Sequence, residues 1–118
     1  MKSRKYRRAK LKVPIYISLP AEILKKMIPF ESEDISEGGL CFQTKQELPL
    51  EADSRIVVSK LANLHPTAHI EGRIAYRRED AVDGRFTVGV EFTGFVNVTR
   101  QELAEKIASW ETGLGVRS

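Results

Sequence analysis

The segment HIEGRIAYRREDAVDGRFTVGVEF, residues 69–92, decides the fold class. Residues 86–92 alternate apolar with small or polar side chains, and residues 69–78 place Ile70, Ile74 and Tyr76 at the same period of two. This period is typical of a β-strand that buries one face. Asp83-Gly84, a dipeptide typical of a tight hairpin turn, stands between the two runs. The segment therefore predicts an antiparallel hairpin, with Tyr76 on the same face as Ile70 and Ile74.

The rest of the chain up to residue 95 repeats this pattern in shorter pieces. Residues 11–19 alternate in the same way, and residues 39–44 and 55–60 predict two further strands. Pro14 lacks an N–H group, so the first strand lies at a sheet edge or directs that position outward. Residues 20–33 are compatible with a helical turn over 21–27 or with a kinked continuation of the first strand. Short strands separated by turns predict an all-β sandwich or a small closed barrel.

The C-terminal segment has a different period. Thr99 precedes Glu102 by three residues, as in a capping box, and Leu103, Ile107 and Trp110 follow on one helical stripe. Gly113 is a plausible end of the helix. We predict a helix over residues 100–112 whose apolar stripe packs on the barrel or on its end.

Basic side chains are concentrated at the N-terminus. Seven of the 19 Lys and Arg residues lie within residues 1–12, whereas the remaining 106 residues carry 12 basic and 16 acidic side chains. This asymmetry indicates an anionic partner, although a solvated tail explains the same charges. At this length we expect one domain over residues 1–118. It would consist of a flexible basic arm (residues 1–10), a β-barrel (residues 11–95) and a C-terminal helix (residues 99–112).

The composition also bears on location. No apolar run reaches the roughly 20 residues of a membrane-spanning helix, and no apolar segment of a secretory signal follows the basic N-terminus. Cys41 is the single cysteine, so the sequence offers no internal disulfide and fits a reducing compartment. We therefore expect a cytoplasmic protein without membrane contact.

Two short motifs flank the first predicted strand. Arg4 and Arg8 form R-x-x-x-R, and Asp34, Ser36 and Gly39 form D-x-S-x-x-G. An arginine fits phosphate or the O6 and N7 edge of guanine, whereas Asp and Ser in a turn present an acceptor and a hydroxyl to one ligand. Gly39 permits a positive φ or a close backbone approach. The motifs are complementary halves of a guanine-nucleotide site, although each alone also fits an ordinary turn or a solvated basic run.

The sequence resembles the PilZ domain family, the bacterial receptor modules for cyclic di-GMP. The resemblance covers nearly the whole chain. It is carried by the R-x-x-x-R arm, LKVPIYI (11–17), EDISEGGLCF (33–42) and VGVEF (88–92). It implies a six-stranded antiparallel barrel with a C-terminal helix. It further implies a receptor or adaptor in bacterial second-messenger signalling, with cyclic di-GMP as ligand, a downstream protein as partner and no other cofactor.

The resemblance also assigns roles to individual residues. Arg4 and Arg8 match the arginines that contact guanine and phosphate, while Lys5 stands where the family often has another arginine and lacks its flat stacking face. Arg7 is an additional cation. The ligand-binding set implied by the resemblance is Arg4, Lys5, Arg7, Arg8, Asp34, Ser36, Gly38, Gly39 and Tyr76. Tyr76 lies near an aromatic position that supports a guanine in some members, although packing at the barrel end explains it equally well. We expect the ligand, as one molecule or as an intercalated pair, to close the arm onto residues 34–39.

Two other functions stay open. A protein of the same fold can act as an interaction adaptor that binds no nucleotide, and a small barrel with a basic arm is compatible with nucleic-acid binding. The net acidic body argues against DNA or RNA as the partner. His65 and His69 are four residues apart, but no Cys or acidic cluster completes a metal site. Cys41 is expected to be a semi-buried structural residue, and because no arrangement predicts catalysis we expect no enzyme.

Overall fold

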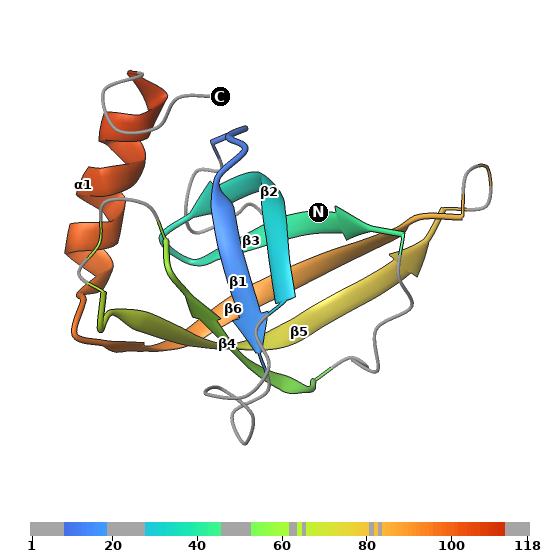
Figure 1. The fold of residues 1–118 in the computed structure, drawn as a ribbon, viewed down its shortest axis with the longest axis horizontal. Coiled ribbons are helices and arrows are strands. Elements are labelled where there is room, and N and C mark those ends of the chain that lie inside the picture. Colours follow the sequence, from blue (N-terminus) through green and yellow to red (C-terminus); the bar gives the residue numbers. More distant parts are fainter. Residues whose placement is uncertain are drawn as a thin grey trace, which may run out of the picture.

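The structure of the chain is a computed structural model, and it describes residues 9–18, 28–45, 53–61, 64, 66–80, 82 and 84–112. Within these residues, six antiparallel strands close into a barrel in the order β1-β2-β3-β6-β5-β4, and one helix follows them (Figure 1). The elements are β1 (Pro14–Ser18), β2 (Ile28–Ser36), β3 (Gly39–Thr44), β4 (Arg55–Ser59), β5 (His69–Glu79), β6 (Phe86–Val96) and α1 (Arg100–Glu111). The expected six-stranded barrel with a C-terminal helix is confirmed.

The alternating apolar side chains fill the barrel. Ile15, Leu40, Phe42, Ile70 and Ile74 have no solvent exposure, and they come from three different strands, β1, β3 and β5. Burial of such side chains stabilises a fold by about 1.5–3 kcal/mol each. Their immediate neighbours along each strand face outward.

The predicted hairpin is the longest pair of strands. β5 and β6 are connected by a turn in which Gly84 has a φ of 70°, and the amide of Asp80 donates to the carbonyl of Arg85 at 2.6 Å. β4 pairs with β5 as far as Arg55, which is opposite Arg73. Two backbone hydrogen bonds at Ile74 extend this contact by one more residue of β5. Beyond that point, the described part of β5 is paired with β6 alone. In Figure 1 this end of the hairpin extends to the right, away from α1.

The first strand is shorter than predicted. β1 begins at Pro14, and residues 9–13 run along β2 without forming a regular strand. Ser32 interrupts the regular pairing: its hydroxyl accepts from the amide of Val13 at 2.9 Å and donates to the carbonyl of Leu11 at 2.5 Å, beside a single backbone hydrogen bond from its amide to the carbonyl of Val13 at 3.0 Å. β1 has β2 and β4 on its two sides, so it is not an edge strand. Leu19 and residues 21–27 lie outside the described residues.

β2 was not predicted, and the earlier placement of Asp34 and Ser36 in a turn was wrong. Both residues lie within β2, and the turn to β3 is formed by Glu37 and Gly38. A β-bulge between Ser32 and Asp34 explains the miss, because Glu33 is an extra residue that breaks the period of two. The buried positions of this strand, Ser32, Ile35 and Ser36, therefore do not follow a period of two.

The C-terminal helix forms as predicted. Thr99 is its N-cap, and both hydrogen bonds of the capping box with Glu102 are present. Leu103, Ile107 and Trp110 are buried against the end of the barrel, where α1 stands at the left in Figure 1. The predicted end at Gly113 lies outside the described residues. Among the helical residues that the structure describes, none forms a helix long and apolar enough to cross a membrane.

Candidate functional site

The strand register brings one motif residue and the predicted aromatic residue into a single row on the outer face. Asp34 of β2 is opposite Cys41 of β3, Cys41 is opposite Gly89 of β6, and Gly89 is opposite Tyr76 of β5. Chain neighbours of the first three, such as Ile35, Leu40 and Val90, are buried in the barrel, and the ring of Tyr76 lies over Gly89, so these four positions face outward. We call this row, with its surroundings, the outer face of β2, β3, β6 and β5.

Tyr76 lies on this outer face and not with Ile70 and Ile74, so the earlier assignment of its side was wrong. A β-bulge between Ile74 and Tyr76 inserts Ala75 and reverses the side to which Tyr76 points. Its ring covers Gly89, because a Cβ built there would come within 2.2 Å of the ring atom Cε1. The ring hydroxyl donates to Sγ of Cys41 at 3.7 Å, and the residue remains 44% exposed. An aromatic ring is thereby held over Gly89, in the same row as Asp34, and stays partly open to solvent.

Ser36 shapes the turn between β2 and β3. Its hydroxyl accepts from the amide of Gly38 at 3.0 Å and donates to the carbonyl of Gly39 at 3.4 Å. The carbonyl of Gly38 in turn accepts from the amide of Phe92 on β6 at 2.9 Å. Since Ser36 is only 3% exposed, its main role in the described structure is to fix the backbone of the D-x-S-x-x-G motif.

Gly39 is needed for a close approach of two backbones. A Cβ at this position would lie 2.2 Å from the carbonyl oxygen of Val90 on β6. Of the two explanations offered for this glycine, close approach therefore applies. Positive φ is recorded among the described glycines only at Gly84.

The same turn is attached to α1. Nη1 of Arg100, the first helical residue, donates to the carbonyl of Glu37 at 2.9 Å, and its guanidinium lies 4.8 Å from the ring centre of Phe95. A cation over an aromatic face is a favourable contact. The helix N-terminus is thus bonded directly to the motif turn.

Four predicted ligand residues, Arg4, Lys5, Arg7 and Arg8, lie outside the described residues. The description begins at Ala9, which forms an isolated antiparallel bridge with Ile35 of β2. Each of the two residues donates its amide to the carbonyl of the other at 2.9 Å. The residue that follows R-x-x-x-R is therefore fixed between Asp34 and Ser36 along β2.

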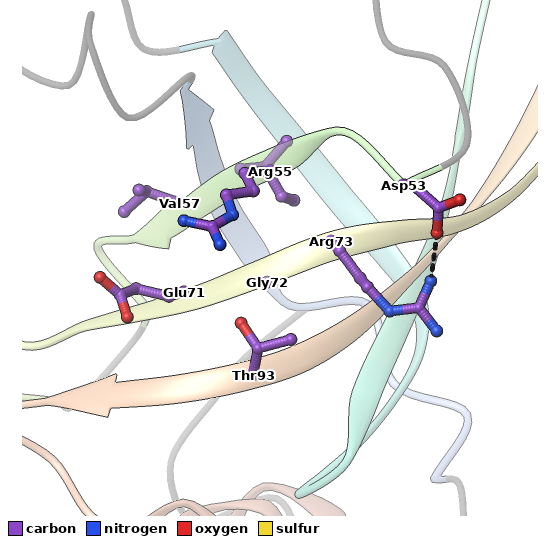
Figure 2. Close-up of a pocket in the computed structure, with 8 residues that line it drawn as sticks. Asp53, Arg55, Val57, Glu71, Gly72, Arg73 and Thr93 are labelled. Atoms are coloured by element: carbon purple, nitrogen blue, oxygen red, sulfur yellow. Dashed lines mark hydrogen bonds and ion pairs between the residues drawn. The ribbon is translucent and has the colours of Figure 1, made fainter.

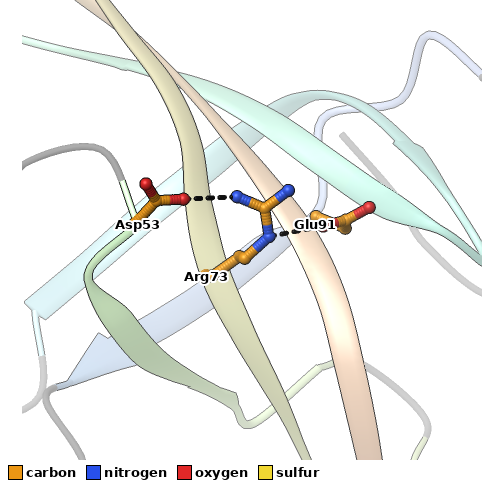
Figure 3. A network of polar contacts seen from close by, with 3 residues as sticks. All are labelled: Asp53, Arg73 and Glu91. Carbon is orange, nitrogen blue, oxygen red and sulfur yellow. Dashed lines mark hydrogen bonds and ion pairs between the residues drawn. The ribbon is translucent and has the colours of Figure 1, made fainter.

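Arg73 and Glu91 extend the outer face by a second row. Ser36 is opposite Gly39, Gly39 is opposite Glu91, and Glu91 is opposite Arg73. Nε of Arg73 donates to Glu91 at 2.6 Å and Nη1 donates to Asp53 at 2.7 Å (Figure 3). The hydrogen bond and charge of Glu91, and then the charge of Asp53, raise the pKa of Arg73 above its usual value.

These two residues were not identified from the sequence. The period of two in residues 86–92 already directs Glu91 outward, between the buried side chains of Val90 and Phe92. What the sequence lacks is the register, which decides that Glu91 meets Gly39 on one side and Arg73 on the other. Only the paired strands supply that information.

A pocket of about 440 Å³ adjoins this row over β4, β5 and β6 (Figure 2). Arg73 and Asp53 form one side of it, and Arg55, Val57, Glu71 and Thr93 form the rest. Its lining charges are mixed in sign, with Arg55 and Arg73 against Asp53 and Glu71. No group of His, Cys, Asp or Glu side chains suited to a metal ion occurs in the described part of the chain, and His65 falls outside it.

Comparison with known families identifies the fold. The sequence matches the family model of the PilZ domain over residues 2–109. The chain belongs to the PilZ domain family. Three PilZ-like structures cover 95–96% of this chain: the Bacillus subtilis inhibitor of motility MotI/DgrA (TM-score 0.74, 14% identity), K. pneumonia MrkH in complex with c-di-GMP (0.72, 16%) and Escherichia coli YcgR in complex with c-di-GMP (0.61, 18%). At these identities the likeness concerns the fold.

This PilZ chain spans about half the length of those proteins, since it covers 53%, 54% and 47% of them respectively. No curated protein sequence matches the chain. The PilZ fold accounts for the closed barrel and for the helix that follows it.

Proposed function

We propose that this PilZ domain protein is a non-enzymatic, cytoplasmic receptor for cyclic di-GMP in bacterial second-messenger signalling, and that the ligand closes the basic arm onto the outer face. The observation that carries the proposal is the two-way hydrogen-bonded bridge between Ala9 and Ile35. Because Ile35 stands between Asp34 and Ser36, the bridge brings the C-terminal end of the arm to the D-x-S-x-x-G motif.

The length of the arm supports this assignment. Arg8 adjoins Ala9, so their Cα atoms are about 3.8 Å apart, and the five Cα–Cα steps from Arg4 to Ala9 span at most about 18 Å. The row from Asp34 to Tyr76 crosses three strand spacings, or about 14 Å. Ala9 lies on the β1 side of β2, so Tyr76 is one further strand spacing from it, or about 19 Å. Arg8 is therefore within reach of the Asp34 end of the outer face, and Arg4, on an extended arm, is within reach of the Tyr76 end.

The chemistry of the face fits a guanine base and two phosphates. The carboxylate of Asp34 is suited to accept from the N–H groups of a guanine edge, and the exposed ring of Tyr76 offers a stacking surface. A stacked base contributes about 1–3 kcal/mol, and a hydrogen bond to a charged group about 1.5–3 kcal/mol. The arginines of the arm supply the positive charge that the phosphates require. That two proteins of the same fold are complexes with c-di-GMP supports the same ligand.

Calorimetric titration with cyclic di-GMP tests the proposal. We expect saturable binding by the wild type and a roughly ten- to thousand-fold loss in Arg8→Ala, since each 1.4 kcal/mol is about tenfold. The matched control is Arg85→Ala, which removes an exposed arginine beyond the last paired residues of β5 and β6. Absence of binding by the wild type, or an equal loss in both variants, would contradict the proposal.

The closing step has its own measurement, amide hydrogen exchange of residues 4–12 with and without ligand. We expect slower exchange in the complex, and unchanged protection at saturating ligand would rule out closure. The ligand would then act on a downstream protein partner through the changed surface, as ordering segments do in other switches. Binding of an oligonucleotide with a steep salt dependence would instead favour a nucleic-acid function. Binding of a protein partner by a wild type that takes up no nucleotide would favour the adaptor.

A further inference from the structure

Glu91 occupies an unusual position beside the proposed site. It is opposite Gly39, the last residue of the D-x-S-x-x-G motif, and its side chain is 51% exposed. Because Gly39 carries no side chain, no side chain of β3 separates the carboxylate of Glu91 from the motif turn. In the second row of the outer face, Glu91 is therefore the acidic group next to the motif.

Arg73 holds this carboxylate in place. Its Nε donates to Oε1 of Glu91, while its Nη1 is anchored on Asp53 (Figure 3). The guanidinium has two effects on Glu91. It restricts the side chain to one direction, and it offsets the repulsion that a bare carboxylate would exert on the phosphates of a ligand. The second carboxylate oxygen, Oε2, is not used in this ion pair.

A cyclic dinucleotide with two guanines presents two identical donor edges, each with N1–H and N2–H groups. Asp34 accounts for one of them. We propose that Glu91, positioned by Arg73, accepts hydrogen bonds from the donor edge of the second guanine. This inference rests on the proposed function and deepens it, because it assigns the residue that reads the second base.

The spacing of the two carboxylates agrees with this assignment. Asp34 and Glu91 are two strands apart and two residues apart along the strands. With about 4.8 Å between strands and about 3.4 Å per residue, their Cα atoms are about 12 Å apart. Two acceptors at that separation, on one continuous face, suit a ring with a base at each end.

The test compares two ligands with two variants by calorimetry. The ligands are cyclic di-GMP and the mixed ring that contains one guanine and one adenine, whose exposed edge lacks the N1–H and N2–H donors. We expect Glu91→Gln to lower the affinity for cyclic di-GMP by about tenfold or more, which corresponds to the loss of one charge-assisted hydrogen bond. The mixed ring should lose less than about threefold, because its single guanine stays on Asp34.

Glu71→Gln is the control, because it removes an exposed carboxylate from β5 without touching the row of Gly39. It should leave both affinities unchanged. The inference is overturned if Glu91→Gln lowers the affinity for both rings equally or changes neither affinity. It is also overturned if Glu71→Gln causes the same losses of affinity. These results are distinct from failure of the proposed function, in which the wild type itself would not bind cyclic di-GMP. Thermal unfolding of each variant verifies that the barrel is intact.

Discussion

The substitution Gly39→Ala separates a structural role of the motif glycine from a ligand contact. The added Cβ would stand 2.2 Å from the carbonyl oxygen of Val90 and 3.4 Å from Cα of Glu91. Both neighbours are backbone atoms of β6, so relief requires the strands themselves to shift by about 1 Å. Overpacking of this kind costs about 1–3 kcal/mol.

An opposing effect reduces this cost. Alanine restricts the unfolded chain more than glycine does, which favours folding by about 0.4–1 kcal/mol. We therefore expect Gly39→Ala to lower the free energy of unfolding by about 1–2 kcal/mol. For a chain of this size that corresponds to a fall in Tm of roughly 4–8 °C.

Urea unfolding, followed by circular dichroism, measures this loss. The control is Gly89→Ala, whose added Cβ meets only the ring of Tyr76, a half-exposed side chain that can rotate away. We expect its unfolding free energy to change by less than about 1 kcal/mol. An unchanged urea midpoint in Gly39→Ala, or a larger loss in Gly89→Ala, would refute the close-approach argument.

Three further predictions concern the outer face and its supports. Tyr76→Ala should lower the affinity for cyclic di-GMP by about five- to a hundredfold while leaving the urea midpoint nearly unchanged. A calorimetric affinity equal to that of the wild type would contradict the stacking role of Tyr76. Ser32→Ala deprives the buried amide of Val13 of its acceptor and should lower the free energy of unfolding by about 1–3 kcal/mol in urea titrations. An unchanged free energy of unfolding would show that this hydrogen bond is dispensable. The ion pairs of Arg73 raise its pKa in the folded state above that in the unfolded state. The stability that they contribute is therefore complete below the unfolded-state pKa and is lost only as pH rises through the folded-state pKa. The difference in urea midpoint between wild type and Arg73→Met should therefore be constant from neutral to mildly alkaline pH, and a decrease over that range would contradict the ion-pair assignment.

The parts of the fold that follow one unbroken period were predictable. Residues 86–92 keep a strict alternation, and the buried Val88 and Val90 confirm it. Thr99 and Glu102 likewise specify the start of the helix through local hydrogen bonds, which depend on no distant residue. In both cases the information lies within a few neighbouring positions.

Bulges account for the main failures. The extra residue Glu33 breaks the alternation in β2, so that strand was not predicted. The extra residue Ala75 does the same in β5, so Tyr76 was predicted to lie on the opposite side from the one it occupies. A bulge depends on how two strands match, so neither strand alone reveals it. The same applies to the candidate site: the D-x-S-x-x-G motif is visible in the sequence, but the neighbours Gly89 and Glu91 follow only from the register.

The unequal lengths of β4 and β5 have a consequence for self-association. A closed barrel leaves no free sheet edge where its strands are paired on both sides. Residues 75–79 of β5, however, extend past the end of β4, and among the described residues no strand pairs with them on that side. Such a border is a template on which a second copy can pair and start an aggregate. Here it carries consecutive cations, Arg77 and Arg78, so two copies aligned in this way would bring like charges face to face. Electrostatic repulsion at this border thus protects the overhanging ribbon at high protein concentration.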